Sequence, residues 1–310
     1  MAKMATRDAY GIALAELVEQ NKSIVVLDAD LSGSTKSGSA AKVDPNRHKN
    51  MGIAEGNMMA VAAGMAANGL TVFASSFAMF AVGRAFEQIR NSICYPNLNV
   101  KVCASHAGIT VGEDGASHQT VEDISLMRSI PNMIVVSPSD GHSAKKAVKA
   151  VAAIQGPCYV RLGRLAVEEV YENDDCPFEI GKGNVLREGK DVVIIANGYM
   201  VQQPLLAYDM LKEQGITPTV IDMHTIKPID KELIVKYASD AKLVVTCEEH
   251  SIIGGLGSAV SEVLAQECPT KMAFVGIKDT FGESGTPAEL CEKYGLTAKA
   301  VVDAVVVGLK

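Results

Sequence analysis

The sequence predicts an α/β fold of two consecutive domains, each a mostly parallel sheet flanked by helices. Short β-branched runs alternate with segments of helical periodicity along all 310 residues. The alternation lapses once, between Leu165 and Lys190, in an acidic and turn-rich stretch that precedes a very apolar strand. The length also suits two domains, since a domain spans about 100–200 residues. We therefore expect a first domain at 1–166, a linker at 167–189 and a second domain at 190–310.

Helical spacing of apolar residues identifies the helices, and short apolar runs identify the buried strands. In the first domain, the predicted helices span residues 8–21, 55–68, 79–92, 121–130 and 141–154. The predicted strands there span 23–27, 71–74, 99–104, 133–137 and 158–161. In the second domain, we expect helices at 201–214, 231–238, 256–265 and 298–308 and strands at 217–221, 242–246 and 272–275, after the apolar strand D-V-V-I-I-A-N-G.

Composition excludes several classes of function. The formal net charge of −7 disfavours a general electrostatic attraction to nucleic acid or anionic membranes, while allowing a local basic pocket for a small anion. The first residues hold no apolar signal core, and no stretch has the roughly 20 apolar residues of a spanning helix, so we expect a cytoplasmic chain. Seven scattered cysteines without a C-x-x-C pair should be reduced and pack as small hydrophobic residues, and we expect no metal site.

The segment S-H-A-G-I-T-V-G-E-D-G-A-S-H-Q at 105–119 is the richest in chemically active residues. It follows an apolar strand and precedes a helix, the position where parallel sheets place their sites. Its glycines allow tight bends, while His106, Asp114 and His118 could point into one crevice. The alternative is a glycine-rich turn whose polar residues cap the helix near Glu122.

Two further features lie upstream. Glu55 begins an Ala- and Met-rich helix, and it is either a carboxylate stabilised by the helix dipole or a buried group that hydrogen-bonds a ligand nitrogen. Phe73, Phe77 and Phe80 hold three of the seven phenylalanines. Their spacing fits ordinary core packing, but a planar heteroaromatic ligand could also stack on one ring.

Arginines and a glycine loop complete the candidates. Arg161 and Arg164 end a strand, and each could form a surface salt bridge or clamp a substrate phosphate bidentately. The run E-E-H-S-I-I-G-G-L-G at 248–257 follows another strand. It is a weak phosphate-binding candidate, because no G-x-x-x-x-G-K-[ST] motif is present and close packing of strand and helix explains its glycines equally well.

Taken together, these segments resemble transketolase. The similarity rests on D-A-D-L-S-G-S, G-I-A-E-G-N-M, F-A-M-F, H-A-G-I-T-V-G-E-D-G-A-S-H-Q, H-T-I-K-P-I-D and E-E-H-S-I-I-G-G-L-G, and it covers nearly the whole chain. It matches only the carboxyl-terminal half of that enzyme, the pyrimidine-binding domain followed by the C-terminal domain, as in transketolases split into two chains. The first domain would then be the pyrimidine-binding domain.

The resemblance implies a cofactor and a partner. The cofactor is thiamine diphosphate, whose diphosphate and Mg²⁺ (or Ca²⁺) the family holds with a G-D-G…N motif that this chain lacks. A separate amino-terminal-half chain should therefore hold them, in a homodimer of such pairs. The implied reaction moves a two-carbon ketol unit from a ketose phosphate to an aldose phosphate in the pentose phosphate pathway.

The resemblance also assigns roles to residues. Glu55 matches the glutamate that contacts the cofactor's aminopyrimidine nitrogen, Phe80 the ring that stacks on it with Phe77 alongside, and Asp30 an acidic residue nearby. Sugar hydroxyls would be held by Asp114 and His118, and the phosphate end by Ser34, His106 and Arg164. Glu55 and His118 are the expected catalytic residues.

Two departures from the family pattern concern the pyrimidine pocket. Gly56 and Asn57 follow Glu55 where many relatives have a bulkier residue, and Gly83 replaces a third aromatic ring, so we expect a looser pocket. Two rival functions remain. One is the β chain of another thiamine enzyme, of the 2-oxoacid dehydrogenase or deoxyxylulose-phosphate synthase type, and the other is a non-catalytic regulatory or scaffold chain.

Overall fold

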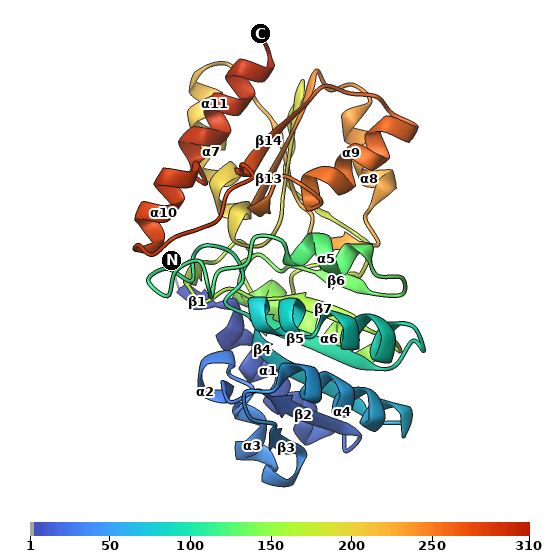
Figure 1. The fold of residues 1–310 in the computed structure, drawn as a ribbon. Helices are drawn as coiled ribbons and strands as arrows, with labels where there is room; N and C mark the ends of the chain where they lie inside the picture. The colour runs from blue at the N-terminus through green and yellow to red at the C-terminus, as the bar shows by residue number, and fades with distance from the viewer. Residues whose placement is uncertain (1–2) are drawn as a thin grey trace.

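Two mostly parallel sheets, one above the other, form the frame of the computed structural model, which describes residues 3–310 (Figure 1). The lower sheet has seven strands in the order β12-β6-β7-β5-β4-β2-β3, and the upper has five in the order β14-β13-β10-β11-β9. This architecture confirms the predicted α/β class with two consecutive sheets flanked by helices.

Alternating side chains of the lower sheet serve two cores, as the two-residue period of a strand requires. Its parallel strands are β2 (Ile24–Asp28), β3 (His48–Asn50), β4 (Thr71–Phe77), β5 (Val100–Ser105), β6 (Ile134–Val136) and β7 (Cys158–Arg161). One face packs on α1 (Thr6–Gln20) and α6 (Gly141–Ala153). The other packs on α4 (Glu55–Ala67), the π-helical turns η2 (Met79–Arg84) and η3 (Gln88–Cys94), and α5 (Asp123–Ser129).

The upper sheet is built in the same way. Its strands are β9 (Asn184–Arg187), β10 (Val192–Ala196), β11 (Thr219–Asp222), β13 (Leu243–Ser251) and β14 (Met272–Ile277), with only β9 antiparallel. One face packs on α7 (Gln202–Glu213), α10 (Pro287–Tyr294) and α11 (Ala298–Gly308). The other packs on α8 (Lys231–Ala238) and α9 (Leu256–Glu267), within a core that continues into the lower domain.

Two short pairings join distant parts of the chain. Strand β12 (Thr225–Lys227) comes from the second half, yet it pairs antiparallel with β6 at the edge of the lower sheet. Strand β1 (Lys3–Ala5) pairs with β8 (Ala166–Glu168), so the start of the described chain lies beside the end of the first sheet. The lower sheet therefore draws on residues beyond 166, while the exact domain bounds stay a prediction.

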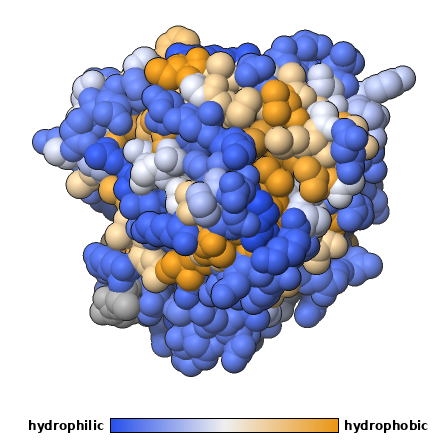
Figure 2. All heavy atoms as spheres, turned by 90° about the horizontal axis from the view of Figure 1, so that it is seen from below, coloured by the Kyte–Doolittle hydropathy of each residue, from blue (hydrophilic) through white to orange (hydrophobic). Residues whose placement is uncertain are grey.

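The remaining short elements cover the lower end of the molecule. They are α2 (Ser32–Thr35), α3 (Ser39–Val43) and η1 (Pro45–Arg47), with η4 (Gly198–Val201) preceding α7 in the upper domain. Figure 2, seen from below, shows that this end is mostly hydrophilic, with hydrophobic residues gathered into patches. Its solvated surface contrasts with the mostly apolar interior of the sheet above it.

Several elements differ from the sequence prediction. The helix expected at 79–92 consists of the two π-helical turns η2 and η3. Helix α10 was not predicted, although Thr286 and Glu289 form a capping box and Pro287 opens it. The strand expected at 242–246 continues to Ser251, so the polar run 248–250 lies in β13 and not in a loop after it. The polar residue types of this run do not predict a buried strand, yet Glu249 and His250 are buried against the lower domain and Glu248 against its own domain.

A buried ion pair marks the junction between the domains. Arg161 Nε donates to Asp123 Oδ2 at 2.7 Å, and the Tyr159 hydroxyl donates to the same oxygen at 2.6 Å. Arg161 Nη2 also donates to the backbone carbonyl of Glu249 in the upper domain at 2.9 Å. Burial by itself would raise the pKa of Asp123, but Arg161 and the hydrogen bonds outweigh it and lower that pKa. Arg161 is therefore an interdomain clamp rather than a ligand for phosphate.

We expect Asp123→Ala to lower the free energy of unfolding by about 3 kcal/mol or more, because it leaves the Arg161 charge buried and unpaired. Urea unfolding followed by circular dichroism measures this. Glu16→Ala, which breaks an exposed pair with Lys149, should cost less than about 1 kcal/mol. A loss of that small size for Asp123→Ala would contradict the clamp.

Candidate active site

The candidate residues gather at the carboxyl ends of the parallel strands of the lower sheet, the usual place for a site in such a fold. Phe77 ends β4, His106 follows β5, and Asp30 follows β2. Arg164 follows β7, and Glu55 begins α4 after β3. Topology thus brings together residues spread over more than a hundred positions of sequence.

Two phenylalanines and two histidines form one aromatic cluster. The Phe77 ring stacks on His106 with centroids 3.7 Å apart and on Phe80 at 5.9 Å. His118 lies edge-on to Phe80, with centroids 5.1 Å apart. The predicted residues Phe77, Phe80, His106 and His118 are therefore neighbours, from two separate segments of the chain.

Glu55 is the most distinctive group of the site. Its side chain is 3% exposed at the start of α4, and its Oε2 lies 3.5 Å from Arg84 Nη1. Its Oε1 finds no hydrogen-bond partner among residues 3–310. Arg84 also covers the face of Phe80, with its guanidinium carbon 4.3 Å from the ring centroid. A buried carboxylate oxygen without a partner is costly, so this geometry suits a ligand that brings an N–H donor beside the Phe80 ring.

The protonation of His106 follows from its two neighbours. Arg7 Nη1 lies 3.1 Å from His106 Nε2, and because an arginine can only donate, Nε2 must accept. The ring proton then sits on Nδ1, which donates to Ser105 Oγ at 2.9 Å. Burial, followed by the charges of Arg7 and Arg164, lowers the pKa of His106 to about 3. His106 is therefore a neutral residue with a fixed tautomer.

The other predicted residues lie at the margin of the cluster. Ser34 is linked to His106 through Arg7, which donates to the Ser34 carbonyl at 3.0 Å. Asp30 Oδ1 accepts from Asn50 at 2.8 Å on the adjacent strand end. Arg164 donates to the Val111 carbonyl and to Glu113, so an anion would have to displace Glu113 from it.

Asp114, like Asp30, forms no hydrogen bond, ion pair or ring contact with the aromatic cluster. It is exposed, and it forms no side-chain hydrogen bond or ion pair with the rest of residues 3–310.

On the side of the site expected to hold the pyrimidine, a Cβ at Gly83 would overlap the methyl group of Met79. Met79 therefore fills the space that the missing ring was expected to leave open.

A pocket of about 340 Å³ opens beside the aromatic cluster. Phe80 and Arg84 form one wall, Ser117 and Glu122 a second, and Phe281 of the upper domain a third.

Within residues 3–310, no group of three or more His, Cys, Asp or Glu side chains is arranged to hold a metal ion. All seven cysteines are free thiols, and no helix in this part of the chain is long and apolar enough to cross a membrane.

Sequence reasoning missed two arginines and a glutamate that shape the site. Arg7 precedes any recognisable motif, and its role depends on a contact 99 residues away. Arg84 was seen only as a helix residue, although its position one turn after Phe80 places it over that ring. Glu249 was assigned to a glycine loop, whereas it reaches the 106–119 segment, as described below.

Comparison with known proteins defines the class of the chain. Residues 2–169 match the family model of the transketolase pyrimidine binding domain, and residues 181–301 match that of the transketolase C-terminal domain. The chain belongs to the transketolase family. The family domains imply dependence on thiamine diphosphate, and the unpartnered Glu55 oxygen beside Phe80 fits the aminopyrimidine end of that cofactor.

Three relatives narrow this assignment. The chain is 51% identical over 306 residues to a putative transketolase C-terminal section from Methanocaldococcus jannaschii, covering 98% of this chain and 96% of the relative. A solved split-gene transketolase, an inactive β4 tetramer, matches with 56% identity and a TM-score of 0.92, covering 99% and 98% of the two chains. A 6-deoxy-6-sulfo-D-fructose transketolase subunit from a Clostridium species is 44% identical, with coverages of 96% and 92%. This chain is thus similar to the C-terminal part of a split transketolase.

We expect the His106 imidazole to stay neutral between pH 5 and 8. The unfolded histidine takes up its proton near pH 6.5 and the folded one near pH 3. The contribution of this group to the free energy of unfolding therefore falls as the pH drops from about 6.5 to 3. A pH titration followed by nitrogen-15 NMR of the imidazole ring measures the pKa of His106 in the wild type and in the Arg7→Met variant. Arg7→Met should raise the pKa, and a wild-type titration near 6.5 would contradict the assignment.

Proposed function

We propose that this chain is the C-terminal-half subunit of a two-chain transketolase. The complex transfers a two-carbon ketol unit reversibly from a ketose phosphate such as xylulose 5-phosphate to an aldose phosphate such as ribose 5-phosphate. The observation that carries the proposal is the buried Glu55 carboxylate, whose Oε1 has no partner within residues 3–310 and which lies at the rim of the aromatic cluster. A regulatory or scaffold chain would have no need of such a group.

The cofactor end of the site is formed by Glu55, Phe80, Phe77 and Asp30. Thiamine diphosphate supplies, when bound, the carbon nucleophile that breaks and re-forms the sugar's carbon–carbon bond. Glu55, whose Oε1 is unpartnered within residues 3–310, would hold the aminopyrimidine ring and could share a proton with its ring nitrogen, while the neighbouring Arg84 would neutralise part of the carboxylate charge. Phe80 offers its ring face for stacking once Arg84 moves aside, and Phe77 fixes the position of Phe80.

The sugar end is formed by His118, Asp114, Ser34, His106 and Arg164. His118 Nδ1 pairs with Ser117 Oγ at 3.0 Å, which leaves Nε2 to bind or pass a proton to a sugar hydroxyl. His106, held neutral, accepts from Arg7 and so orients that guanidinium without adding charge. Arg7 and Arg164 supply the positive charge for an anionic tail, so a phosphate suits them and the sulfonate of the sulfo-sugar relative's substrate suits them too.

The partner in this proposal is an amino-terminal-half chain that holds the diphosphate and most of the Mg²⁺ or Ca²⁺ coordination. Two such pairs form the working enzyme, in the cytoplasm and in the pentose phosphate pathway. The inactive β4 tetramer of the split-gene relative supports the need for a second kind of chain.

Co-expression with the amino-terminal-half chain tests the proposal. The complex, given thiamine diphosphate and Mg²⁺, should convert xylulose 5-phosphate and ribose 5-phosphate into sedoheptulose 7-phosphate and glyceraldehyde 3-phosphate, whereas this chain alone should be inactive. A parallel assay with a 6-sulfo-ketose distinguishes the two anionic tails. Turnover by the isolated chain, or no two-carbon transfer by the complex with either donor, would overturn the proposal.

Glu55→Gln should cut turnover of the complex by about 100-fold or more, because the amide is nearly isosteric but cannot share the proton. Steady-state assays at saturating cofactor measure this, after a check that the variant still assembles. Glu87→Gln, an exposed carboxylate beyond η2, is the matched control and should be unaffected. Activity of Glu55→Gln within twofold of wild type would reduce Glu55 to a helix-start residue.

A further inference from the structure

We propose that Glu249 of the upper domain is a positioning residue that sets the shape of the sugar-binding segment 106–119. The inference rests on the proposed function and deepens it, because it gives the C-terminal domain a part in substrate binding. The contact is direct: the Thr110 backbone N–H donates to Glu249 Oε1 at 2.7 Å, across 139 residues of sequence. Thr110 lies midway between His106 and Asp114, so this bond fixes the centre of the segment.

The environment of Glu249 favours a dedicated contact. The side chain is 3% exposed, and burial raises the pKa of its carboxyl group while Arg161 and the Thr110 hydrogen bonds oppose that rise. The Arg161 guanidinium that pairs with Asp123 also holds the Glu249 backbone carbonyl. Arg161, which joins the two domains, therefore also fixes the backbone that places the Glu249 carboxylate beside Thr110.

The segment itself is built to admit this carboxylate. Gly108 has a φ of +80°, and a Cβ there would overlap the Glu249 carboxylate. Gly108 N–H also donates to the Thr120 carbonyl at 3.0 Å, which closes the base of the segment. A side chain at 108 would thus both strain the backbone and push Glu249 away from Thr110.

A second contact holds the far end of the segment on the same domain. Gln119 Nε2 donates to the Glu283 carbonyl at 2.9 Å and to the carbonyls of Ile109 and Gly112 at 3.2 Å each. A Cβ at Gly115 would lie against Ser284 Oγ. The segment is therefore held against the upper domain near its middle and at its end, while His106 and His118 face the aromatic cluster.

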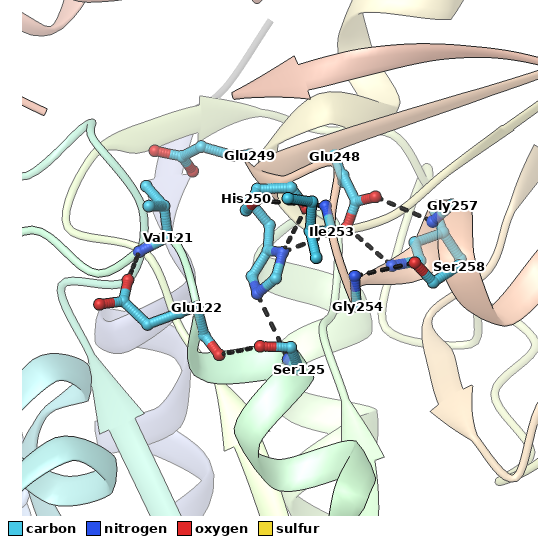
Figure 3. Close-up of polar contacts among 12 residues, drawn as sticks. Val121, Glu122, Ser125, Glu248, Glu249, His250, Ile253, Gly254, Gly257 and Ser258 are labelled. Atoms are coloured by element: carbon cyan, nitrogen blue, oxygen red, sulfur yellow. Dashed lines mark hydrogen bonds and ion pairs between the residues drawn. The ribbon is translucent and has the colours of Figure 1, made fainter. Parts of the chain in front are cut away.

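Glu248 provides a matched comparison because it is adjacent, equally buried and differently used. Figure 3 shows the two neighbouring side chains pointing in opposite directions from β13. Glu248 accepts from Leu256 N–H at 2.7 Å and Gly257 N–H at 2.8 Å, so it caps α9 within its own domain. His250 beside it accepts from Ser125 N–H at 3.3 Å. Among residues 3–310, Glu248 forms no hydrogen bond or ion pair with 106–119, so its loss tests stability without removing a hydrogen bond of that segment.

The test compares Glu249→Met with Glu249→Gln. Both fill the space and both remove the charge, but only glutamine keeps an acceptor for the Thr110 N–H. In the two-chain complex, Glu249→Met should raise the KM for the ketose phosphate about 10-fold, the effect of one lost hydrogen bond to an ionised group, with the Kd for thiamine diphosphate unchanged. Glu249→Gln and Glu248→Gln should keep KM within about twofold of wild type.

Hydrogen exchange on the isolated chain gives a readout independent of activity. Peptides covering 106–119 should exchange faster in Glu249→Met and at the wild-type rate in Glu249→Gln and Glu248→Gln. Wild-type exchange and KM in Glu249→Met would overturn the inference, as would equal losses in all three variants, which indicate a purely structural role. Faster exchange in Glu249→Met, together with a wild-type complex that transfers no ketol unit, would instead refute the proposed function and leave the positioning role intact.

Discussion

The arrangement of the two domains depends on one almost fully buried cation. Arg161, at the end of β7, is neutralised by Asp123 and held by the backbone of β13, so the strand end of one sheet is fixed against a strand of the other. A guanidinium in that position must be paired, and only one relative placement of the sheets supplies all of its partners. The position of the sheets also determines where Glu249 lies, because β13 places its carboxylate against the segment that begins at His106.

The candidate site shows how a chain with a net negative charge can bind anions. The net charge is −7, yet Arg7, Arg84 and Arg164 surround the aromatic cluster. Each already has a local hydrogen-bond acceptor: Arg7 has His106 and the Ser34 carbonyl, Arg84 has Glu55, and Arg164 has Glu113. Binding of an anion therefore exchanges one partner for another, which favours ligands that can match the geometry of the guanidinium groups over a general attraction to negative charge.

The sequence was sufficient for the fold class and for most of the residues that meet in the cluster, because both depend on local signals. Helix periodicity located α4 and α6. Residue type marked positions 55, 77, 80, 106 and 118 as candidates, and the resemblance to transketolase selected them over ordinary packing or capping. The sequence was insufficient where contacts between distant parts of the chain determine the role of a residue or the sheet that a strand joins. Nothing local distinguishes Arg7 from a surface arginine, the buried Glu-Glu-His run reads as a loop, and β12 joins a sheet formed by a distant part of the chain. The exposed Asp114 has a role assigned by resemblance that no contact within residues 3–310 supports.

The edge position of β12 also constrains how the protein can be made. Strand β6 is next to the edge of its sheet only because residues 225–227 cover it, and these residues leave the ribosome after all the other strands of that sheet. At about 5–20 residues per second, the growing chain exposes the N–H and C=O groups of β6 for several seconds before their partner arrives. An uncovered strand of that kind is a template for pairing between chains. A fragment that ends at the family-model boundary near residue 169 would keep this aggregation-prone edge permanently, so the two domains are a single unit of biosynthesis although they are two units of architecture.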